Sequence, residues 1–399
     1  MRALLAASPP PTADEARTDS LPDVPTDSRA DAGSTSLAAW RAAVAPHTAP
    51  FTLPIDRALV AAAHADRLAF AFAAGYTEAL RALVPTATDA MALCATEAGG
   101  AHPRAIQTAL TRTSAGTSTG TSTGTSAGAS GGTSAGYTLT GRKNWATGAN
   151  TAAFLLVVAS IGVDATGTNH LRVVRVPTNA PGLRITAAPA PFVPEIEHAT
   201  VELTDVAVAE ADILPGDGYA DYLKPFRTVE DAHVHAALAA YLMGVARRRG
   251  WREYTERMLA LALATRAVAT AEPRLVTTHI ALAGVLALAA REVADFEAHW
   301  AAAASASAAA AASAAASASA AAPPSAAAPP SAAAPPSTAA PPSTATSAPP
   351  EGADAEHVRW LRDRPLLKTA ASARAARRER AWEQLGEPRL SPSPRAPTV

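Results

Sequence analysis

Two short stretches of this chain hold the residue types that could do chemistry, one beginning at Thr96 and one ending at Thr147. In the second stretch, a turn at 140–141 leads into a predicted strand that carries Trp145 just before its end. An aromatic ring beside a hydroxyl group suits a flat heteroaromatic ligand, because the ring offers a stacking surface and the hydroxyl can bond a ring heteroatom. A tryptophan within a strand is, however, more often part of the core. The residues leave both interpretations open.

The order of these motifs resembles the acyl-CoA dehydrogenase family. Members of that family carry a Thr-Glu-Pro-Gly-x-Gly-Ser-Asp run, followed later by Gly-x-Lys-x-Trp-Ile-Thr. The corresponding stretches here are TEAGGAH at 96–102 and GRKNWAT at 141–147. Downstream, VELTDVAVAEADILPGDG at 201–218 resembles a later strand of the family and the loop that leaves it. The resemblance extends, with gaps, over residues 66–300.

This resemblance implies a flavoprotein oxidoreductase that acts on the CH–CH group of an acyl thioester or a related small-molecule substrate. It implies FAD as the cofactor, with FMN as the alternative, and it assigns Thr96, Trp145 and Thr147 to the flavin pocket. The partners that it implies are acyl-CoA as the substrate, an electron-accepting flavoprotein and further copies of the chain in a homo-oligomer.

The catalytic base is the least defined part of the resemblance. Aligned on the family pattern, Val234 takes the position at which some members hold a catalytic Glu. Glu230 and Asp231 lie four and three residues earlier, so a helix would place both on the face of Val234. Either carboxylate could serve as a displaced base, because burial would raise its pKa towards the working range. Alternatively, both acids stabilise a helix N-terminus.

Departures from the family pattern keep two other functions open. Residues 100–102 read Gly-Ala-His in place of Gly-Ser-Asp, so the serine hydroxyl of the family is absent. One alternative is a flavin-dependent monooxygenase on the same fold, which needs no carboxylate base and which residues 271–276 weakly resemble. The other is a degenerate binding or scaffold subunit without turnover.

Hydrophobic periodicity predicts helices over 36–85 and 230–300, separated by a region of short apolar runs and turns over 90–214. The strand signals of that region are Leu93–Thr96, Tyr137–Leu139, Phe154–Ser160, Leu171–Val176, Leu183–Ile185 and Thr200–Leu203. This pattern predicts the α+β class. The resemblance adds an architecture, namely an N-terminal α-helical region, a central β-barrel and a C-terminal helical bundle.

Low-complexity composition divides the chain further, because Ala, Ser, Thr, Gly and Pro tracts lack the apolar side chains that offset ordering entropy. The expected organisation is a disordered tail (1–35), a shortened α-helical domain (36–89), a β-barrel domain (90–218) with a low-complexity insert (113–136), a helical bundle (219–300), an Ala/Pro/Ser-rich linker (301–350), a final bundle helix (351–386) and a second disordered tail (387–399).

Charge and cysteine content exclude several classes of function. The formal net charge of −1 over 399 residues gives no strong field for nucleic acid or for an anionic membrane. The single cysteine, Cys94, excludes an internal disulfide and fits a reducing compartment. The Ala run at 301–322 carries serines and no large apolar residue, which disfavours bilayer insertion. No residue spacing indicates a metal site. We therefore expect a soluble, cytoplasmic protein.

Overall fold

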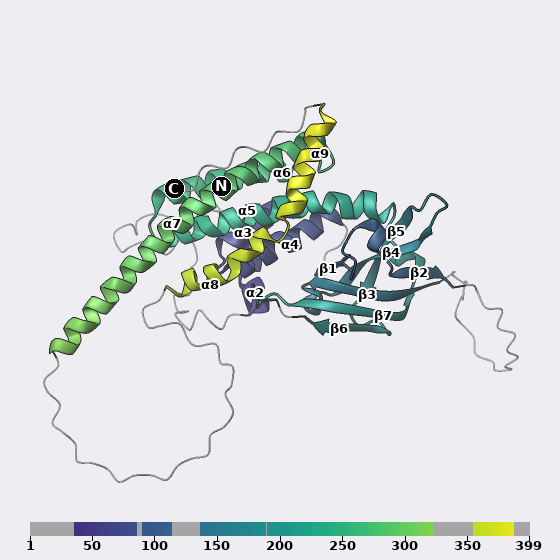
Figure 1. Cartoon of the computed structure of the whole chain (residues 1–399). Helices are drawn as coiled ribbons and strands as arrows, with labels where there is room; N and C mark the ends of the chain where they lie inside the picture. The colour runs from purple at the N-terminus through teal and green to yellow at the C-terminus, as the bar shows by residue number, and fades with distance from the viewer. Residues whose placement is uncertain (1–35, 86–89, 114–135, 189, 322–353, 387–399) are drawn as a thin grey trace, which may run out of the picture.

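A computed structural model of the chain describes residues 36–85, 90–113, 136–188, 190–321 and 354–386. Helices come first, a seven-stranded sheet second and helices again third, and the two helical parts lie together beside the sheet (Figure 1). This order confirms the α+β class predicted from the sequence. The two expected tails and residues 114–135 of the expected insert lie outside the described residues.

From residue 36 onward, the described N-terminal part contains the helices α2 (Leu37–Thr48), α3 (Pro54–Ala63) and α4 (Leu68–Leu83). Ser36 caps α2 by accepting a hydrogen bond from the amide of Ala39 at 3.1 Å. The helical region predicted over 36–85 is interrupted between α3 and α4. The turn is held there by Arg248 of a later helix, whose guanidinium donates to the carbonyl of Ala65 at 3.3 Å.

The seven strands are β1 (Met91–Cys94), β2 (Ala109–Arg112), β3 (Tyr137–Thr147), β4 (Phe154–Val163), β5 (Asn169–Pro177), β6 (Leu183–Ala187) and β7 (His198–Val208). β4 pairs with β5 on one edge and with β1 and β2 on the other, after which β3, β7 and β6 follow. β2 and β3 form an antiparallel pair. The sheet curls into a half-barrel (Figure 1), and Ile213 forms an isolated bridge with Val174 of β5.

Alternate residues of β4 face two separate cores. Phe154, Leu156 and Val158 belong to the core shared with the helices, whereas Leu155 and Val157 belong to a second core on the other face of the sheet. Successive side chains of a strand point to opposite faces, so a continuous apolar run is what a strand buried on both faces requires. The helices thus cover one face of the sheet, and the side chains on its other face form the second core.

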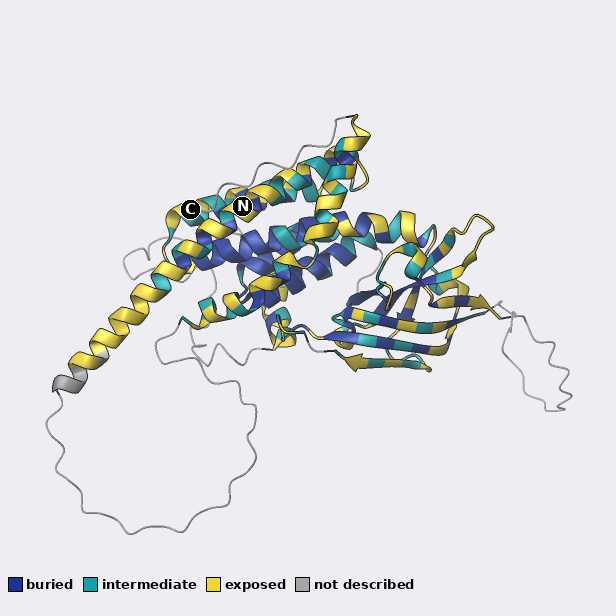
Figure 2. Ribbon diagram, viewed as in Figure 1, coloured by how far each residue is buried: buried dark blue, intermediate teal, exposed yellow. Residues whose placement is uncertain are grey.

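The C-terminal part contains α5 (Lys224–Arg248), α6 (Arg252–Ala269), α7 (Val276–Ala321), α8 (Ala355–Asp363) and α9 (Ala371–Gln384), with short helical turns at Pro103–Ala105, Ala149–Thr151, Glu210–Asp212, Gly218–Leu223 and Arg364–Lys368. α5 is the central helix, and Figure 2 shows it buried along most of its length. A Cβ atom at Gly244 would lie 2.6 Å from the carbonyl oxygen of Ala63. Glycine at this position therefore lets α5 approach α3 closely.

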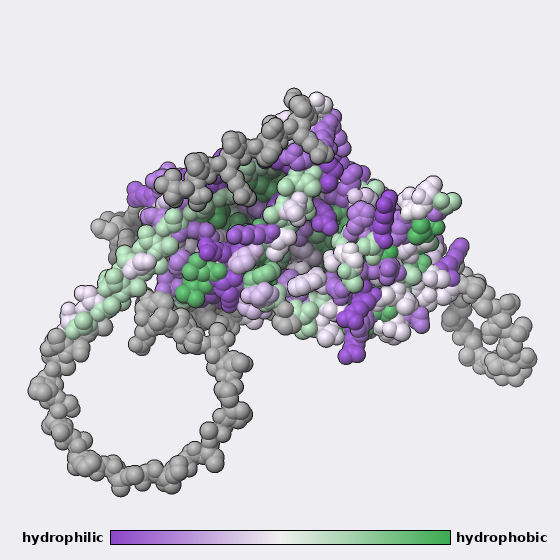
Figure 3. Space-filling model, in the orientation of Figure 1, coloured by the Kyte–Doolittle hydropathy of each residue, from purple (hydrophilic) through white to green (hydrophobic). Residues whose placement is uncertain are grey.

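α7 corrects the linker expected over 301–350, because the helix continues to Ala321. Alanine has the highest helix propensity of all residues, and an uninterrupted Ala-rich stretch extends a helix that packing has already nucleated. Trp300 is the last fully buried side chain of α7. Beyond it the helix projects away from the bundle, mostly exposed in Figure 2 and only weakly hydrophobic in Figure 3.

We expect a proline in the projecting part of α7 to leave global stability unchanged. Ala309→Pro should reduce the helical signal in circular dichroism without lowering the melting temperature, because the exposed segment packs against nothing in the described chain. The matched control is Ala290→Pro, which is also exposed but lies beside buried Ala289 and Val293. It should cost about 3 kcal/mol, or roughly 6–12 °C. Equal losses in both variants would show that the projection stabilises the fold.

The final bundle helix expected over 351–386 is instead two helices, α8 and α9, joined by a helical turn. Pro365 lies in that turn, and a proline removes a backbone donor and disfavours helix at the residue before it. Trp360 anchors α8, because its buried ring stacks on Tyr241 and Trp300 with centroid distances of 6.2 and 6.0 Å.

One helix of the described residues, Val276–Ala314 within α7, is long and apolar enough to cross a membrane by length and composition alone. The core helix of a folded protein can pass the same test. Phe296 and Trp300 of this helix are fully buried in the bundle. Glu292 on the same helix forms an ion pair with Arg257 at 2.6 Å. Of the apolar 18-residue window in this helix, 22% is buried within the described fold.

Candidate functional site

Trp145 is an exposed aromatic ring near the end of β3. Its side chain is 57% exposed, so the interpretation as a core residue is wrong. Its backbone φ angle is +57°, which is unusual for a residue other than glycine, and it lies within a break in the pairing between β3 and β7. This bulge turns the ring outward, where it meets the ring of His198 edge-on at 5.7 Å.

Thr147 and His198 face each other across β3 and β7. The two are register partners, and the hydroxyl of Thr147 shares a hydrogen bond with Nδ1 of His198 at 3.2 Å. Burial lowers the pKa of His198, which keeps its ring neutral at neutral pH. Its other nitrogen, Nε2, is buried and has no hydrogen-bond partner within the described part of the chain. Sequence reasoning did not assign His198 to the site, because only strand register brings it to Thr147.

Thr96 is brought to the same end of the sheet by the segment that follows β1. Its carbonyl accepts a hydrogen bond from the amide of Asn144 at 2.7 Å, directly before Trp145 in the chain. The three residues predicted to contact a cofactor, Thr96, Trp145 and Thr147, thus lie on neighbouring segments. The first is partly buried, the second exposed and the third partly buried.

A buried ion pair fixes these segments to one another. Nζ of Lys143 lies 2.6 Å from a carboxylate oxygen of Glu97 and also donates to the carbonyl of Val158 at 2.6 Å. The same carboxylate accepts from the hydroxyl and amide of Thr108, at 2.8 and 3.0 Å, and from the amide of Gln107 at 2.8 Å. Lys143 is fully buried, and Glu97 is nearly so.

The pKa values of Glu97 and Lys143 reflect their burial and their pairing. Burial alone would raise the pKa of Glu97, but its hydrogen bonds from Lys143 and from two backbone amides hold it below the usual value. Burial lowers the pKa of Lys143, and the Glu97 carboxylate opposes that effect. Gly141 completes the junction, because a Cβ there would lie 2.5 Å from the Thr108 hydroxyl oxygen and its φ of +156° disfavours other residues.

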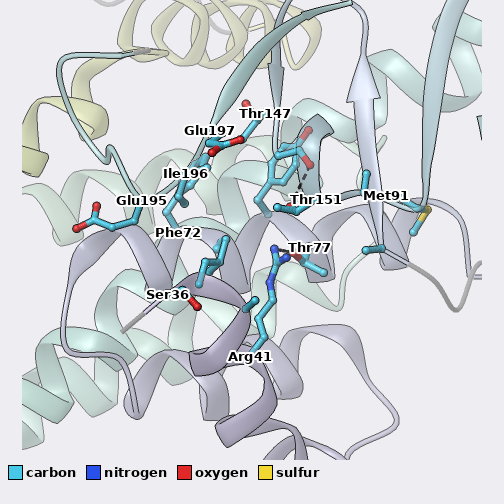
Figure 4. Close-up of a pocket in the computed structure, with 17 residues that line it drawn as sticks. Ser36, Arg41, Phe72, Thr77, Met91, Thr147, Thr151, Glu195, Ile196 and Glu197 are labelled. Carbon is cyan, nitrogen blue, oxygen red and sulfur yellow. Dashed lines mark hydrogen bonds between the residues drawn. The ribbon is translucent and has the colours of Figure 1, made fainter. Parts of the chain in front are cut away.

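A cavity of about 220 Å³ lies between the N-terminal helices and this end of the sheet (Figure 4). Apolar side chains such as Phe72, Tyr76 and Met91 form much of its wall. Thr147 lines the cavity from β3, whereas neither Trp145 nor Thr96 is part of its wall. The site therefore consists of an exposed aromatic ring on one side of Thr147 and a partly apolar cavity on the other.

Glu230 and Asp231 do not lie at a helix N-terminus, where the capping alternative would place them. α5 already begins at Lys224, so both acids lie within the helix and the capping interpretation is wrong. Asp231 forms ion pairs with Arg374 and Arg377 of α9, at 3.4 and 2.5 Å. These contacts fasten α9 to α5 and leave the Asp231 carboxylate engaged.

Glu230 is partly buried, and no hydrogen bond to its carboxylate is present within the described chain. Burial, reinforced by the charge of Asp231, raises the pKa of Glu230 to about 7. The Glu230 charge in turn contributes to a raised pKa of Tyr76, whose main cause is burial. Tyr76 lines the cavity, but Glu230 does not.

The raised pKa of Glu230 predicts a pH-dependent stability. The unfolded value is about 4.3, so ionisation of Glu230 destabilises the folded state progressively as pH rises from about 4 through 7. We expect Glu230→Gln to gain melting temperature over the wild type at pH 8 but not at pH 4. Glu256→Gln, which removes an exposed glutamate of α6, is the matched control and should show no such trend. A constant difference across this range would contradict the raised pKa.

The remaining imidazoles do not form a metal site. His233 and His235 each use Nδ1 in a hydrogen bond to a carbonyl one turn earlier, at 2.8 Å. Nowhere in the described ranges do three His, Cys, Asp or Glu side chains come together as metal ligands.

Comparisons with known proteins find similarity only among solved structures. No family model matches the chain, and no curated protein matches it. A butyryl-CoA dehydrogenase from Megasphaera elsdenii is 14% identical, with a TM-score of 0.43 over 60% of this chain and 70% of that one. FMN-bound TdsC from Paenibacillus sp. A11-2 is 14% identical, with a TM-score of 0.44 over 60% and 71%. PigA in complex with FAD is 10% identical, with a TM-score of 0.44 over 65% and 79%. At these values the similarities carry no argument about activity.

Proposed function

We propose that the chain is a flavin-dependent oxidoreductase of the acyl-CoA dehydrogenase type, acting on the CH–CH group of an acyl thioester or a related substrate. The observation that carries this proposal is the position of Thr147, between the exposed ring of Trp145 and a partly apolar cavity. The motif resemblance independently assigns both residues to a flavin. FAD is the first candidate and FMN the second.

The residues present fit a flavin in two respects. The face of Trp145 is available for stacking, because the ring is more than half exposed and meets His198 only at its edge. The orphaned Nε2 of His198 and the hydroxyl of Thr147 offer polar atoms next to that ring. Trp145, Thr147 and Thr96 would hold the group, which when bound supplies an acceptor for two electrons.

The chain's own residues would then bind the substrate and manage a proton. The apolar wall formed by Phe72, Tyr76 and Met91 excludes water and suits an acyl chain. With a pKa of about 7, the carboxylate of Glu230 is poised to accept a proton at neutral pH. Glu230 lies outside the cavity wall, and its charge acts on Tyr76, which lines the cavity, so a substrate would have to place its acidic α-carbon on the Tyr76 side.

Anaerobic mixing of flavin-loaded protein with butyryl-, octanoyl- and palmitoyl-CoA tests this proposal. We expect at least one thioester to bleach the flavin absorbance of the wild type, and Glu230→Gln to abolish the bleaching. Asp231→Asn is the control, because that carboxylate is already held by Arg374 and Arg377. No bleaching of a fully loaded wild type by any of the thioesters would contradict the proposal.

The position of Glu230 outside the cavity wall favours one alternative, a flavin-dependent monooxygenase, which needs no carboxylate base. The discriminating measurement is oxygen-dependent product formation when reduced flavin is supplied, in a protein that no thioester bleaches. The scaffold alternative is separated from both enzymes by an absence of flavin binding.

A further inference from the structure

A guanidinium group lies in the wall of the cavity without a carboxylate partner. Arg41 of α2 is partly buried, and its guanidinium donates to the hydroxyl of Thr77 on α4 at 3.3 Å. No acidic side chain in the described part of the chain forms an ion pair with it. Burial and the nearby positive charge of Arg81 both lower the pKa of Arg41. Within the described residues, Arg41 is thus a partly desolvated positive charge without a neutralising carboxylate, which is unfavourable without a ligand.

The two carboxylates that line the cavity are not ion-pair partners of the Arg41 guanidinium. Glu195 is engaged by Arg67 and Arg362, with contacts of 3.2 and 2.9 Å. Glu197 is exposed and accepts a hydrogen bond from Asn150 at 2.5 Å. Figure 4 shows Arg41 beside Thr77 and apart from both glutamates. The positive end of the cavity is therefore the α2–α4 side.

Next to this charge the cavity is apolar. Phe72 and Tyr76 lie one turn apart on α4 and line the cavity together with Thr77, and their rings stack at 5.9 Å. Leu37 of α2 lies one helical turn before Arg41 and also lines the cavity. The volume of about 220 Å³ lies below the usual range of about 300–1,000 Å³ for ligand pockets, so the occupant is a small molecule or one end of a larger one.

We propose that this cavity binds a ligand with a short apolar body and a terminal carboxylate, which Arg41 and Thr77 recognise. A guanidinium binds a carboxylate through charge-assisted hydrogen bonds, and the Thr77 hydroxyl can donate to the same group. That this ligand is the substrate rests on the proposed oxidoreductase function. That the cavity binds a carboxylate follows from Arg41, Thr77 and the apolar wall, whatever the reaction. The substrate class that follows is an acyl compound carrying a free carboxylate at the end remote from Thr147.

The test measures binding of hexanoate and hexanamide to the full-length chain by calorimetry and by thermal shift, without a flavin-dependent readout. These probes match in size and differ in charge. Hexanoate should bind the wild type at least tenfold more tightly than hexanamide. Arg41→Gln should weaken hexanoate binding by about 10- to 150-fold, since a hydrogen bond to a charged group contributes about 1.5–3 kcal/mol. It should leave hexanamide binding unchanged.

Two further variants separate recognition from folding. Arg41→Lys keeps the charge and should retain part of the preference for hexanoate. Arg81→Gln removes a nearby arginine that is already paired with Glu78, and hexanoate affinity should stay at the wild-type value. Equal affinity of the wild type for both probes, or no binding of hexanoate, would overturn the inference even if Arg41→Gln failed to fold.

Flavin titration of the same preparations keeps this inference distinct from the proposed function. Flavin binding without a preference for hexanoate would overturn the carboxylate site and leave the oxidoreductase proposal standing. A preference for hexanoate in a protein that binds no flavin would contradict the oxidoreductase proposal and leave the carboxylate site standing.

Discussion

Replacing Glu97 by glutamine is expected to lower the free energy of unfolding by about 3–5 kcal/mol. The variant leaves the charge of Lys143 fully buried without its carboxylate, and an uncompensated buried charge is far more costly than an absent pair. It also weakens the acceptor for Thr108, so the segments that carry Thr96 and Trp145 lose their common anchor. Urea unfolding followed by circular dichroism measures the loss.

The double variant Glu97→Gln/Lys143→Met is the control for this prediction. Removing both charges should recover much of the lost stability, because a neutral pair requires no charge compensation. A single variant as stable as the wild type would show that Lys143 is solvated, contrary to its complete burial.

Replacing Trp145 by alanine is expected to weaken flavin binding by roughly 5- to 150-fold. The basis is the stacking energy of a heteroaromatic base on an aromatic side chain, which is about 1–3 kcal/mol. The ring is 57% exposed and closes no core, so the melting temperature of the apoprotein should hardly change. Fluorescence titration with FAD and with FMN gives the affinities.

Trp145→Phe is the matched control, because it keeps an aromatic face at the same position. It should retain most of the affinity that Trp145→Ala loses. Equal flavin affinity of the wild type and the alanine variant would show that the flavin does not stack on Trp145.

The sequence predicted much of the secondary structure, and it did so where a short periodic pattern decides the element. The runs at Phe154–Ser160 and Leu183–Ile185 lie within β4 and β6, because a short apolar run and its bounding turns are local signals. The linker predicted from residue 301 is wrong as far as Ala321, because alanine favours helix even in a stretch of low complexity. The bridge between Val174 and Ile213 joins residues far apart in the sequence, and no local pattern encodes it.

The candidate site was predicted only as far as its contiguous motifs. Residues 96–102 and 141–147 lie together, but the reason is the buried pairing of Glu97 with Lys143, and sequence reasoning gave neither residue that role. His198 reaches Thr147 through strand register, and Arg41 reaches the cavity through packing of α2 on α4. Both depend on long-range contacts. Asp231 carries a carboxylate that could act as a base. Its ion-pair partners lie far away in sequence, on α9, so no local pattern shows that this carboxylate is engaged.

The most direct test of the central proposal is the visible absorption spectrum of the purified full-length chain, recorded before and after incubation with FAD or FMN and removal of free flavin. A flavin site at Trp145 and Thr147 predicts the two absorbance bands of oxidised flavin in a stoichiometric complex, reduced in the Trp145→Ala variant. A folded protein that stays colourless with either flavin would contradict the proposal and favour a binding or scaffold role.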